Sequence, residues 1–586
     1  MERPFIDLRT RKPKRIAGLL VFALILGACS LGSDDDPIAG NENLVPPPPK
    51  LRGGIEEFPP EKRITTPADG WFDSGCDLPF EYIQRVRRGR YADTRGPDLL
   101  VVPQVPHFFG AFSTTSHSGP WKYVQRVPLV FYGPGFIREQ GDLEVDRDLT
   151  LADIAPTLAE LLGVELPKSH VGRPIDGVLL PEEERAGAPK MVLELVWDGG
   201  GWNVLETWPE AWPYLRELME GGTSVRGVTV GSSPSVTAAV HATMGTGTFP
   251  KQHGIVNIPM RGDSGEVGQS FPQGTPKYLE VPTVADLYDQ HVGNEAKVGM
   301  MAYRFFHLGM IGHGAYLEGG DKDYAVIANT LPGRLETNSD YFQLPDYLQD
   351  VGGFRRDIKQ TDAEDGKIDN VWRGESLDKK QTRRHSPVWV QYQTRILKKL
   401  FREEGFGQDE VTDLFFTNYK QIDDVGHVWN MLDPAMESVI ESSDDALRDL
   451  TTFLDKKVGE NEWVLILTAD HGQAPDPQAV GSWPIQMSEL TTDVAQHFGM
   501  TYDEMFQDQQ AAGFFLRRDV LEAKGVTMEE ISDFVINYRL EDNIKKGQTP
   551  PDQYLDRGNE TLFAAAFPAE KLPKIWSCVL EKKPSS

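Results

Sequence analysis

Several short apolar runs in this sequence stop at residues that can bind a metal ion. These residues are three aspartates and two histidines, namely Asp198, Asp423, His427, Asp470 and His471. Carboxylate and imidazole ligands without a thiolate suit Zn²⁺ or Mn²⁺. Five ligands are too many for one tetrahedral zinc with an open position, and one too few for two sites of three protein ligands each. The set therefore predicts a metal centre that takes another ligand from elsewhere.

The apolar pattern indicates which elements position these residues. Residues 191–197, 413–421 and 464–469 predict strands buried on both faces, as in a parallel sheet. Helical patterns accompany them at 209–221, 389–404 and 437–457. Because parallel strands present their carboxyl ends at one edge of a sheet, the alternation predicts an α/β fold that gathers the ligands there.

Composition limits the class of protein. The chain has 586 residues, of which 39% are hydrophobic, enough for one large domain or two smaller ones. Its formal net charge of -28 argues against a nucleic-acid-binding surface, which is normally basic. An anionic substrate would need bound metal ions to offset this negative field.

The amino terminus predicts an export signal. Basic residues up to Arg15 precede the apolar run 16–28, which is too short to span a bilayer. Residues 26–29 resemble the bacterial lipobox, which implies removal of residues 1–28 and lipidation of Cys29. The lipid would anchor the protein to the membrane of the cell envelope, on its periplasmic or cell-surface face. An ordinary signal peptide with an incidental cysteine is the alternative.

The segment that follows predicts a flexible tether. Residues 29–70 contain aspartate, proline and glycine runs and few large apolar residues, so they cannot form a packed core. Cys76 and Cys578 are the remaining cysteines, one near each end of the folded part. Since disulfides persist outside the cytoplasm, we expect the two to pair. Two separate buried thiols are the alternative.

A turn rich in small residues precedes a predicted helix that begins near Thr237. In the segment 225–255, a strand-like opening leads into this turn, and a glycine-rich loop follows the helix. A hydroxyl at such a turn points into a site, and the amino end of the helix behind it favours an anion.

Four motifs together resemble the alkaline phosphatase superfamily, and most closely its nucleotide pyrophosphatase/phosphodiesterase and related bacterial phosphatase branch. They read VWDGG, SVTAAVHATMGTGTFPKQHGIVN, QIDDVGH and LTADHGQ. The resemblance covers most of residues 71–580. It implies a single catalytic domain built as a three-layer sandwich, with a mostly parallel central sheet between helices.

The resemblance also implies two Zn²⁺ ions and a phospho-threonine intermediate formed on Thr237. One zinc would bind Asp198, Asp470 and His471 together with the Thr237 oxygen. The other zinc would bind Asp423, His427 and one more histidine. An asparagine usually completes the oxygen-binding pocket of the family. Ile258 occupies the family position here, so the expectation shifts to the preceding residue, Asn257.

The missing histidine implies a circular permutation. The family places it near the carboxyl end, where this chain offers only His497. The family's last loop, strand and helix are instead matched by residues 77–180, which supply His117. We therefore expect His117 to be the ligand, with residues 181–190 joining the old end to the old start. His497 as the ligand is the alternative.

The motifs favour one substrate class. The phosphomonoesterase branch carries a Lys and an Arg at positions held here by Tyr303 and Phe305, which favours phosphodiesters or nucleotide pyrophosphates. An alkaline phosphomonoesterase is the alternative. A sulfatase would need a C/S-x-P-x-R motif, which the nucleophile turn lacks, and a non-catalytic surface lipoprotein is the remaining possibility. Residues 339–385 predict a surface insertion, in which 362–369 form an acidic turn rather than a calcium loop.

Overall fold

The computed structural model describes five parts of the chain, which are residues 61–64, 69–91, 95–110, 115–329 and 332–582. The expected export signal, Cys29 and most of the expected tether lie outside these residues. Within the described residues, none of the helices combines the length and the apolar character needed to cross a membrane.

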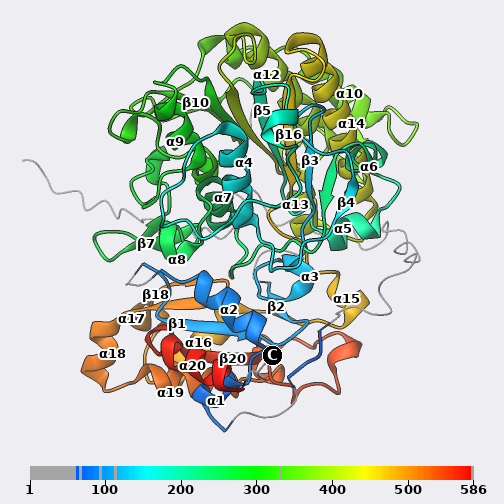
Figure 1. Ribbon diagram of the computed structural model, residues 1–586. Helices are drawn as coiled ribbons and strands as arrows, with labels where there is room; N and C mark the ends of the chain where they lie inside the picture. The colour runs from blue at the N-terminus through cyan, green and yellow to red at the C-terminus, as the bar shows by residue number, and fades with distance from the viewer. Residues whose placement is uncertain (1–60, 65–68, 92–94, 111–114, 330–331, 583–586) are drawn as a thin grey trace, which may run out of the picture.

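A ten-stranded sheet forms the centre of the larger lobe (Figure 1). Its five central strands run parallel. In spatial order they are β10 (Asp323–Ala328), β9 (Val298–Ala302), β15 (Asp413–Tyr419), β5 (Met191–Trp197) and β16 (Trp463–Thr468). On one side, β11 (Leu335–Glu336) and β12 (Phe342–Gln343) pair with β10; on the other, β3 (Leu129–Tyr132), β6 (Thr223–Val225) and β4 (Gly141–Leu143) extend the sheet. The strand β3 is antiparallel to β16.

Helices cover both faces of this sheet. One face packs against α4 (Ile154–Leu162), α7 (Thr237–Thr246) and α9 (Val284–His291); the other packs against α6 (Pro213–Glu220), α12 (Pro387–Glu404) and α14 (Pro434–Lys457). Alternate residues of β5 serve the two cores, with Val192 and Val196 on the first face and Leu193 and Leu195 on the second. The expected α/β sandwich with a mostly parallel sheet is confirmed.

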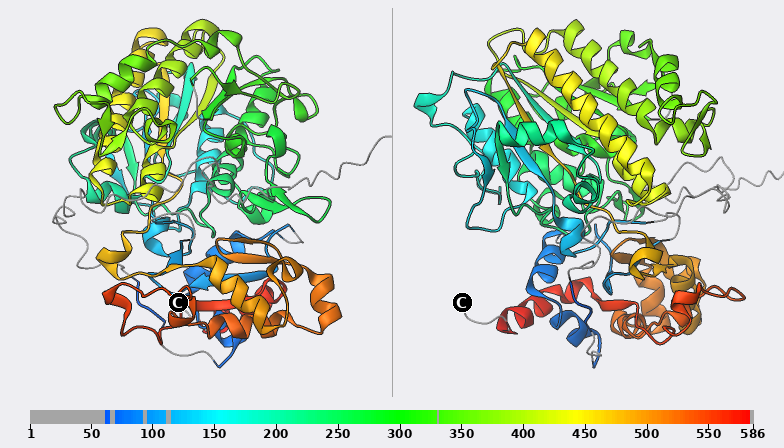
Figure 2. Two further views of the ribbon diagram at one scale, coloured as in Figure 1. Left: turned by 180° about the vertical axis from the view of Figure 1, so that it is seen from behind. Right: turned by 90° about the vertical axis from the view of Figure 1, so that its right-hand side faces the viewer.

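The smaller lobe contains a second sheet that the sequence analysis did not anticipate (Figures 1 and 2). Its four antiparallel strands are, in spatial order, β18 (Phe506–Gln510), β19 (Gly513–Leu516), β1 (Leu99–Pro103) and β20 (Phe563–Pro568). These strands come from both ends of the chain, so local sequence patterns do not reveal their pairing. Helices that pack in the same lobe include α1 (Trp71–Cys76), α2 (Phe80–Arg88), α16 (Met487–His497), α17 (Tyr502–Met505), α18 (Arg518–Lys524), α19 (Met528–Ile536) and α20 (Leu572–Lys582).

A disulfide joins the two ends of the folded chain. Cys76 at the end of α1 bonds Cys578 in α20, and their Cα atoms lie 5.8 Å apart. The pairing expected from the sequence is confirmed.

The segment expected as a surface insertion packs partly into the larger lobe. Its helix α10 (Phe354–Asp362) lies against α12. The acidic stretch 362–369 is a turn, because Asp362 Oδ1 accepts hydrogen bonds from the backbone N–H groups of Asp369, Asn370 and Val371. The segment ends in the interior, where Arg384 is buried against Asp424.

Candidate metal centre

The carboxyl ends of three neighbouring strands bring the predicted ligands together. Asp198 directly follows β5, Asp470 and His471 follow β16, and Asp423 and His427 lie on α13 (Gln421–Val428) just after β15. Since β15 and β16 flank β5 in parallel register, their ends meet at one edge of the sheet. All but His427 are fully buried, so any charge they carry must be balanced within the site.

One group of side chains contains His117, Asp423 and His427. The Nε2 atoms of His117 and His427 lie 3.6 Å and 3.3 Å from Asp423 Oδ1. One ligand atom from each residue lies within 4.8 Å of the others, close enough to hold a single ion. His117 reaches this position from the loop before α3 (Lys122–Gln125). Its ring stacks on the ring of His471, with the two centroids 3.5 Å apart.

A second group contains Asp198, Asp470 and His471. His471 Nε2 lies 3.6 Å from Asp198 Oδ1 and 3.3 Å from Asp470 Oδ2. The same nitrogen lies 3.9 Å from Asp423 Oδ1, so the two groups are adjacent. Asp198, Asp423 and His471 form a group that could hold one ion, and Asp470 adjoins this group through its contact with His471. The residues offer carboxylate and imidazole ligands, which suit zinc.

Hydrogen bonds orient the three histidines for metal binding. Each imidazole directs Nδ1–H to a backbone carbonyl, His117 to Ser235, His427 to Thr115 and His471 to Gly472, at 2.9, 2.9 and 3.0 Å. Donation from Nδ1 leaves the Nε2 lone pair directed into the site. The donor set therefore fits two metal ions.

Burial and Lys420 set the charge of two of the carboxylates. Burial favours the neutral form of Asp198, but the Lys420 ammonium, His307 and His471 together outweigh burial and lower the pKa of that carboxyl. Burial also opposes ionisation of Asp423, yet His427 and Lys420 hold its pKa well below the ordinary value. Both carboxylates are therefore ionised, as metal ligands must be.

Burial also shifts the pKa values of the other ligand candidates in the site. Burial and the nearby Asp198 carboxylate raise the pKa of Asp470 well above its ordinary value. Burial lowers the pKa of His117 and of His471, which keeps both imidazoles neutral. Neutral imidazoles are the form that binds metal, and a cation beside Asp470 would favour its ionised form.

Thr237 is the first residue of α7, so its hydroxyl lies at the amino end of a ten-residue helix. It is buried, and its Oγ1 accepts a hydrogen bond from Lys420 Nζ at 3.4 Å. Lys420 Nζ also lies 2.9 Å from Asp198 Oδ1 and 2.6 Å from Asp423 Oδ2. The ammonium thus connects the expected nucleophile to one carboxylate of each ligand group.

Several residues that the sequence analysis missed contact the ligand carboxylates. Asn418 Nδ2 donates to Asp198 Oδ2 at 2.8 Å, and Gln473 Nε2 donates to Asp423 Oδ1 at 2.7 Å. His307 Nε2 lies 3.7 Å from Asp198 Oδ2 and has no hydrogen-bond partner among the described residues. One signal was available, since Asn418, Lys420 and Gln473 all lie within five residues of a predicted ligand.

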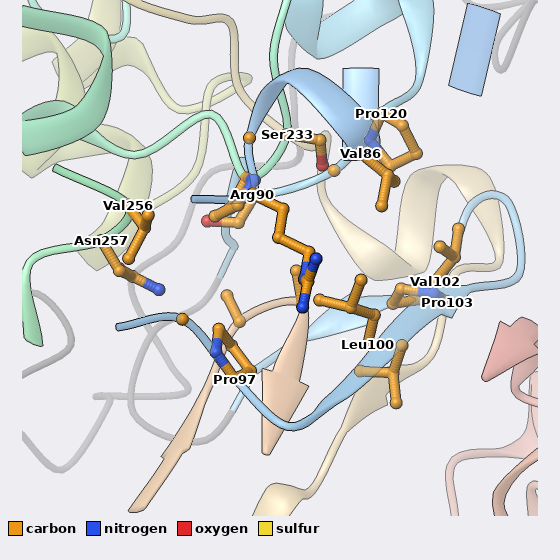
Figure 3. Close-up of a pocket in the computed structure, with 18 residues that line it drawn as sticks. Val86, Arg90, Pro97, Leu100, Val102, Pro103, Pro120, Ser233, Val256 and Asn257 are labelled. Atoms are coloured by element: carbon orange, nitrogen blue, oxygen red, sulfur yellow. The ribbon is translucent and has the colours of Figure 1, made fainter. Parts of the chain in front are cut away.

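Asn257 lies apart from both ligand groups. Its Oδ1 accepts a hydrogen bond from the backbone N–H of Ile258, and no hydrogen bond or ion pair among the described residues links it to Thr237 or the ligands. It lines a mostly apolar cavity between the lobes, with Ser118, Ser233 and Val256 among its walls (Figure 3). Ser118 directly follows His117 in the sequence, but Thr237 and the candidate ligands are not among the residues that line this cavity.

The rival histidine does not reach the site. His497 is exposed at the end of α16 in the smaller lobe, where its ring packs against Phe498 and Phe534. His117 is the histidine beside Asp423.

Tyr303 lies beside two arginines. The guanidinium of Arg384 lies 4.2 Å from the Tyr303 ring centre and forms paired hydrogen bonds with Asp424, at 3.0 and 2.7 Å. Arg304 donates to the Tyr303 hydroxyl at 2.8 Å. These contacts occupy the polar groups just after β9 and link them to Asp424, the residue that follows Asp423.

Comparison with known proteins identifies the family. Residues 192–548 match the family described as type I phosphodiesterase / nucleotide pyrophosphatase. The chain belongs to this family. The resemblance to the alkaline phosphatase superfamily is therefore confirmed, and the ligand groups lie in a chain of an established hydrolase family.

Individual relatives are distant. The chain is 23% identical over 354 residues to a protein named calcium-transporting ATPase from Myroides odoratus, covering 50% of this chain and 62% of that one. It is 24% identical over 336 residues to alkaline phosphatase PhoV of Synechococcus elongatus, covering 49% and 60%. It is 23% identical over 407 residues to alkaline phosphatase PafA of Elizabethkingia meningoseptica, covering 59% and 72%. The chain thus spans about three fifths of the first two relatives, 62% and 60% of their lengths.

A crystal structure of wild-type PafA has a similar fold. It superposes with a TM-score of 0.50 at 19% identity, over 64% of this chain and 84% of that one. At this identity the likeness concerns the fold.

Proposed function

We propose that this protein is an exported, zinc-dependent phosphoric ester hydrolase that cleaves phosphodiesters or nucleotide pyrophosphates through a phospho-threonine intermediate. The observation that carries the proposal is the position of Thr237. Its hydroxyl lies at a helix amino end, and Lys420 links it to one carboxylate of each ligand group.

The ligand groups would hold two zinc ions. His117, Asp423 and His427 would bind one ion, and Asp198, Asp470 and His471, with the Thr237 oxygen, would bind the other. When bound, such ions neutralise phosphoryl oxygens and favour the ionised form of a coordinated hydroxyl.

The chain itself supplies the nucleophile and its surroundings. Thr237 Oγ1 attacks phosphorus and forms a phosphothreonine as the bond to the leaving group breaks. The hydroxyl proton ends on the oxygen of the leaving alcohol or phosphate. Water then hydrolyses the phosphothreonine, which releases the phosphoryl product and restores the hydroxyl. The free N–H groups at the start of α7 favour the phosphoryl anion. Asn257, which lines the cavity between the lobes, is proposed as a further donor to its oxygens.

The residues that follow β9 support a preference for diesters. Tyr303 and Phe305 stand where the phosphomonoesterase branch carries cationic residues, and Arg384 is committed to Asp424. A second phosphate charge would therefore find fewer cationic partners, whereas a diester carries one charge less.

We also propose that the chain is circularly permuted and lipid-anchored through Cys29. Support for the permutation comes from His117, which precedes the other ligands in sequence yet lies beside Asp423. The disulfide between Cys76 and Cys578 holds together the two ends that the permutation would have separated.

Hydrolysis assays test this function. The zinc-loaded protein should hydrolyse a phosphate diester faster than a monoester, and a sulfate ester poorly. The Thr237→Ala variant should lose at least about 10³-fold of the wild-type kcat, whereas Thr237→Ser should keep part of it, because a hydroxyl remains. Full activity in the alanine variant would refute the nucleophile. A carefully purified wild type without bound zinc would instead favour the non-catalytic lipoprotein.

A further inference from the structure

Three carboxylates meet far from the proposed active site. Asp289 lies on α9, Asp323 is the first residue of β10, and Asp321 is exposed on the loop that leads into β10 (Figure 1). One oxygen from each lies within 4.8 Å of the other two. Since β10 runs parallel to β9, this group sits at the amino ends of the strands, whereas the ligand groups described above sit at the carboxyl ends.

Among the described residues, no positive side chain pairs with these carboxylates. Asp289 and Asp323 are only 5% and 6% exposed, and no ion pair within the described residues joins either of them, or Asp321, to a lysine, arginine or histidine. Lys322, which lies between two members of the group, directs its ammonium to the carbonyl oxygen of Ser339 at 2.6 Å. Burying carboxylates without a counter-charge costs several kcal/mol per ion.

One carboxylate oxygen in this group also lacks a partner. Asp289 Oδ1 is buried and has no hydrogen bond among the described residues. Asn294 fixes the same loop through a hydrogen bond from Nδ2 to the Gly319 carbonyl at 2.9 Å, while its Oδ1 is likewise buried without a partner. The acidic turn 362–369 differs, because Asp362 Oδ1 is occupied by backbone N–H groups.

The neighbouring charges add to the imbalance. Asp286, the next acidic group on α9, is paired with His313 at 2.8 Å and so has its own partner. Burial and the nearby carboxylates Asp321 and Asp286 raise the pKa of Asp289 to about 7. Burial and the carboxylates Asp289, Asp286 and Asp321 raise the pKa of Asp323 well above its ordinary value. Both shifts indicate a site that lacks positive charge.

We propose that Asp289, Asp321 and Asp323 bind a hard divalent cation, Ca²⁺ or Mg²⁺, that fastens the loop before β10 to α9. Carboxylate and amide oxygens are the ligands that these ions prefer, and thiolate or imidazole ligands are absent from this group. The ion would stabilise the edge of the large sheet and take no part in hydrolysis.

The test uses the zinc-loaded protein at pH 8, after dialysis against a calcium chelator. Addition of CaCl₂ or MgCl₂ up to about 10 mM should raise the Tm by roughly 2–5 °C, and equilibrium dialysis should find one further ion per chain. A rise in Tm with only one of the two ions also supports the proposal, and the ion that acts indicates the size of the site.

Asp321→Asn is the decisive variant, because Asp321 is exposed and its replacement does not threaten folding. It should weaken the affinity for the added ion roughly tenfold or more, while kcat for the diester stays unchanged. Asp365→Asn, in the exposed acidic turn, is the matched control and should respond like the wild type. The proposal is overturned if neither ion changes the wild-type Tm, or if Asp321→Asn responds as strongly as the wild type.

Discussion

His117 Nε2 lies 3.6 Å from Asp423 Oδ1, although the large sheet is built almost entirely from the chain between them. This neighbour of Asp423 therefore comes from a part of the chain that is far from Asp423 in sequence. His427 approaches the same oxygen from one helical turn away, at 3.3 Å. A loop from the start of the chain and a helix from its later half therefore complete one ligand group.

This relationship predicts the effect of removing the imidazole. His117→Ala should lose about one zinc per chain, because the group keeps only Asp423 and His427 as protein ligands. Elemental analysis of the dialysed protein measures the zinc content. His497→Ala is the control, since that side chain is exposed in the smaller lobe, and it should retain the wild-type content. The same zinc content in both variants would contradict the assignment of His117.

The sequence predicted which carboxylates come together, because their proximity follows from strand order. Asp198, Asp423 and Asp470 each come just after a buried apolar run, and parallel pairing of the three runs leaves no other place for them. His117 could be assigned only through the family resemblance, since no local pattern marks it.

The parts that were missed depend on contacts between distant elements. Lys420 and Asn418 belong to the end of β15, but their roles follow from the register that places Tyr419 opposite Trp197 and so aligns them with Asp198. The small sheet joins β1 to β20 from opposite chain ends. Neither relationship produces periodicity in the sequence.

Lys420 predicts how the protein responds to the loss of its metal ions. Its ammonium lies 2.9 Å from Asp198 Oδ1 and 2.6 Å from Asp423 Oδ2, so it balances both carboxylates when no metal does. Lys420→Met should destabilise the chelated protein by about 3–5 kcal/mol, because two buried charges lose their partner. The metal-loaded form should change less, since bound cations replace that partner.

The difference in Tm between chelated and zinc-loaded protein measures this effect, and it should widen in Lys420→Met. Lys297→Met is a suitable control, because Lys297 pairs with Asp409 and Asp413 far from the ligand groups. An unchanged difference in Lys420→Met would show that the ammonium does not balance the ligand carboxylates.

Glu194 should make the free energy of unfolding fall as the pH rises. It lies in the middle of β5, fully buried, with Oε1 lacking a hydrogen-bond partner among the described residues. Burial raises its pKa from the ordinary value to about 8. The folded protein therefore keeps the proton over a range of pH in which the unfolded chain has released it. Because the folded state binds more protons, this stability is complete below about pH 4.5 and is lost as the pH rises through 8.

Glu194→Gln removes the titrating group and should flatten the decline. The free energy of unfolding, measured in urea between pH 5.5 and 8, should fall by about 2–3 kcal/mol less in the variant than in the wild type. Glu460→Gln, which alters an exposed glutamate on the loop before β16, should keep the wild-type slope. Equal slopes in all three proteins would mean that Glu194 is ionised when folded.

The disulfide allows a direct test of the proposed permutation. Lys582 at the end of α20 reaches Asp77 at 2.7 Å, and the six-residue helix α1 is only about 9 Å long. A flexible linker of about ten residues can therefore join residue 582 to residue 69. New ends can be opened between Gly187 and Ala188, which are exposed in the connector 181–190. The relinked chain should fold, bind the same zinc and hydrolyse the same esters.

Removal of the disulfide should then distinguish the two chain orders. In the native order Cys76 and Cys578 close a loop with a sequence separation of 502, so replacing both by serine should cost about 2–4 kcal/mol. In the relinked chain the linker already holds α1 beside α20, so the same replacements should cost much less. Urea unfolding of the four proteins gives both differences. An equal cost in both orders, or a relinked chain that does not fold, would argue against the proposal that the disulfide replaces a former chain connection.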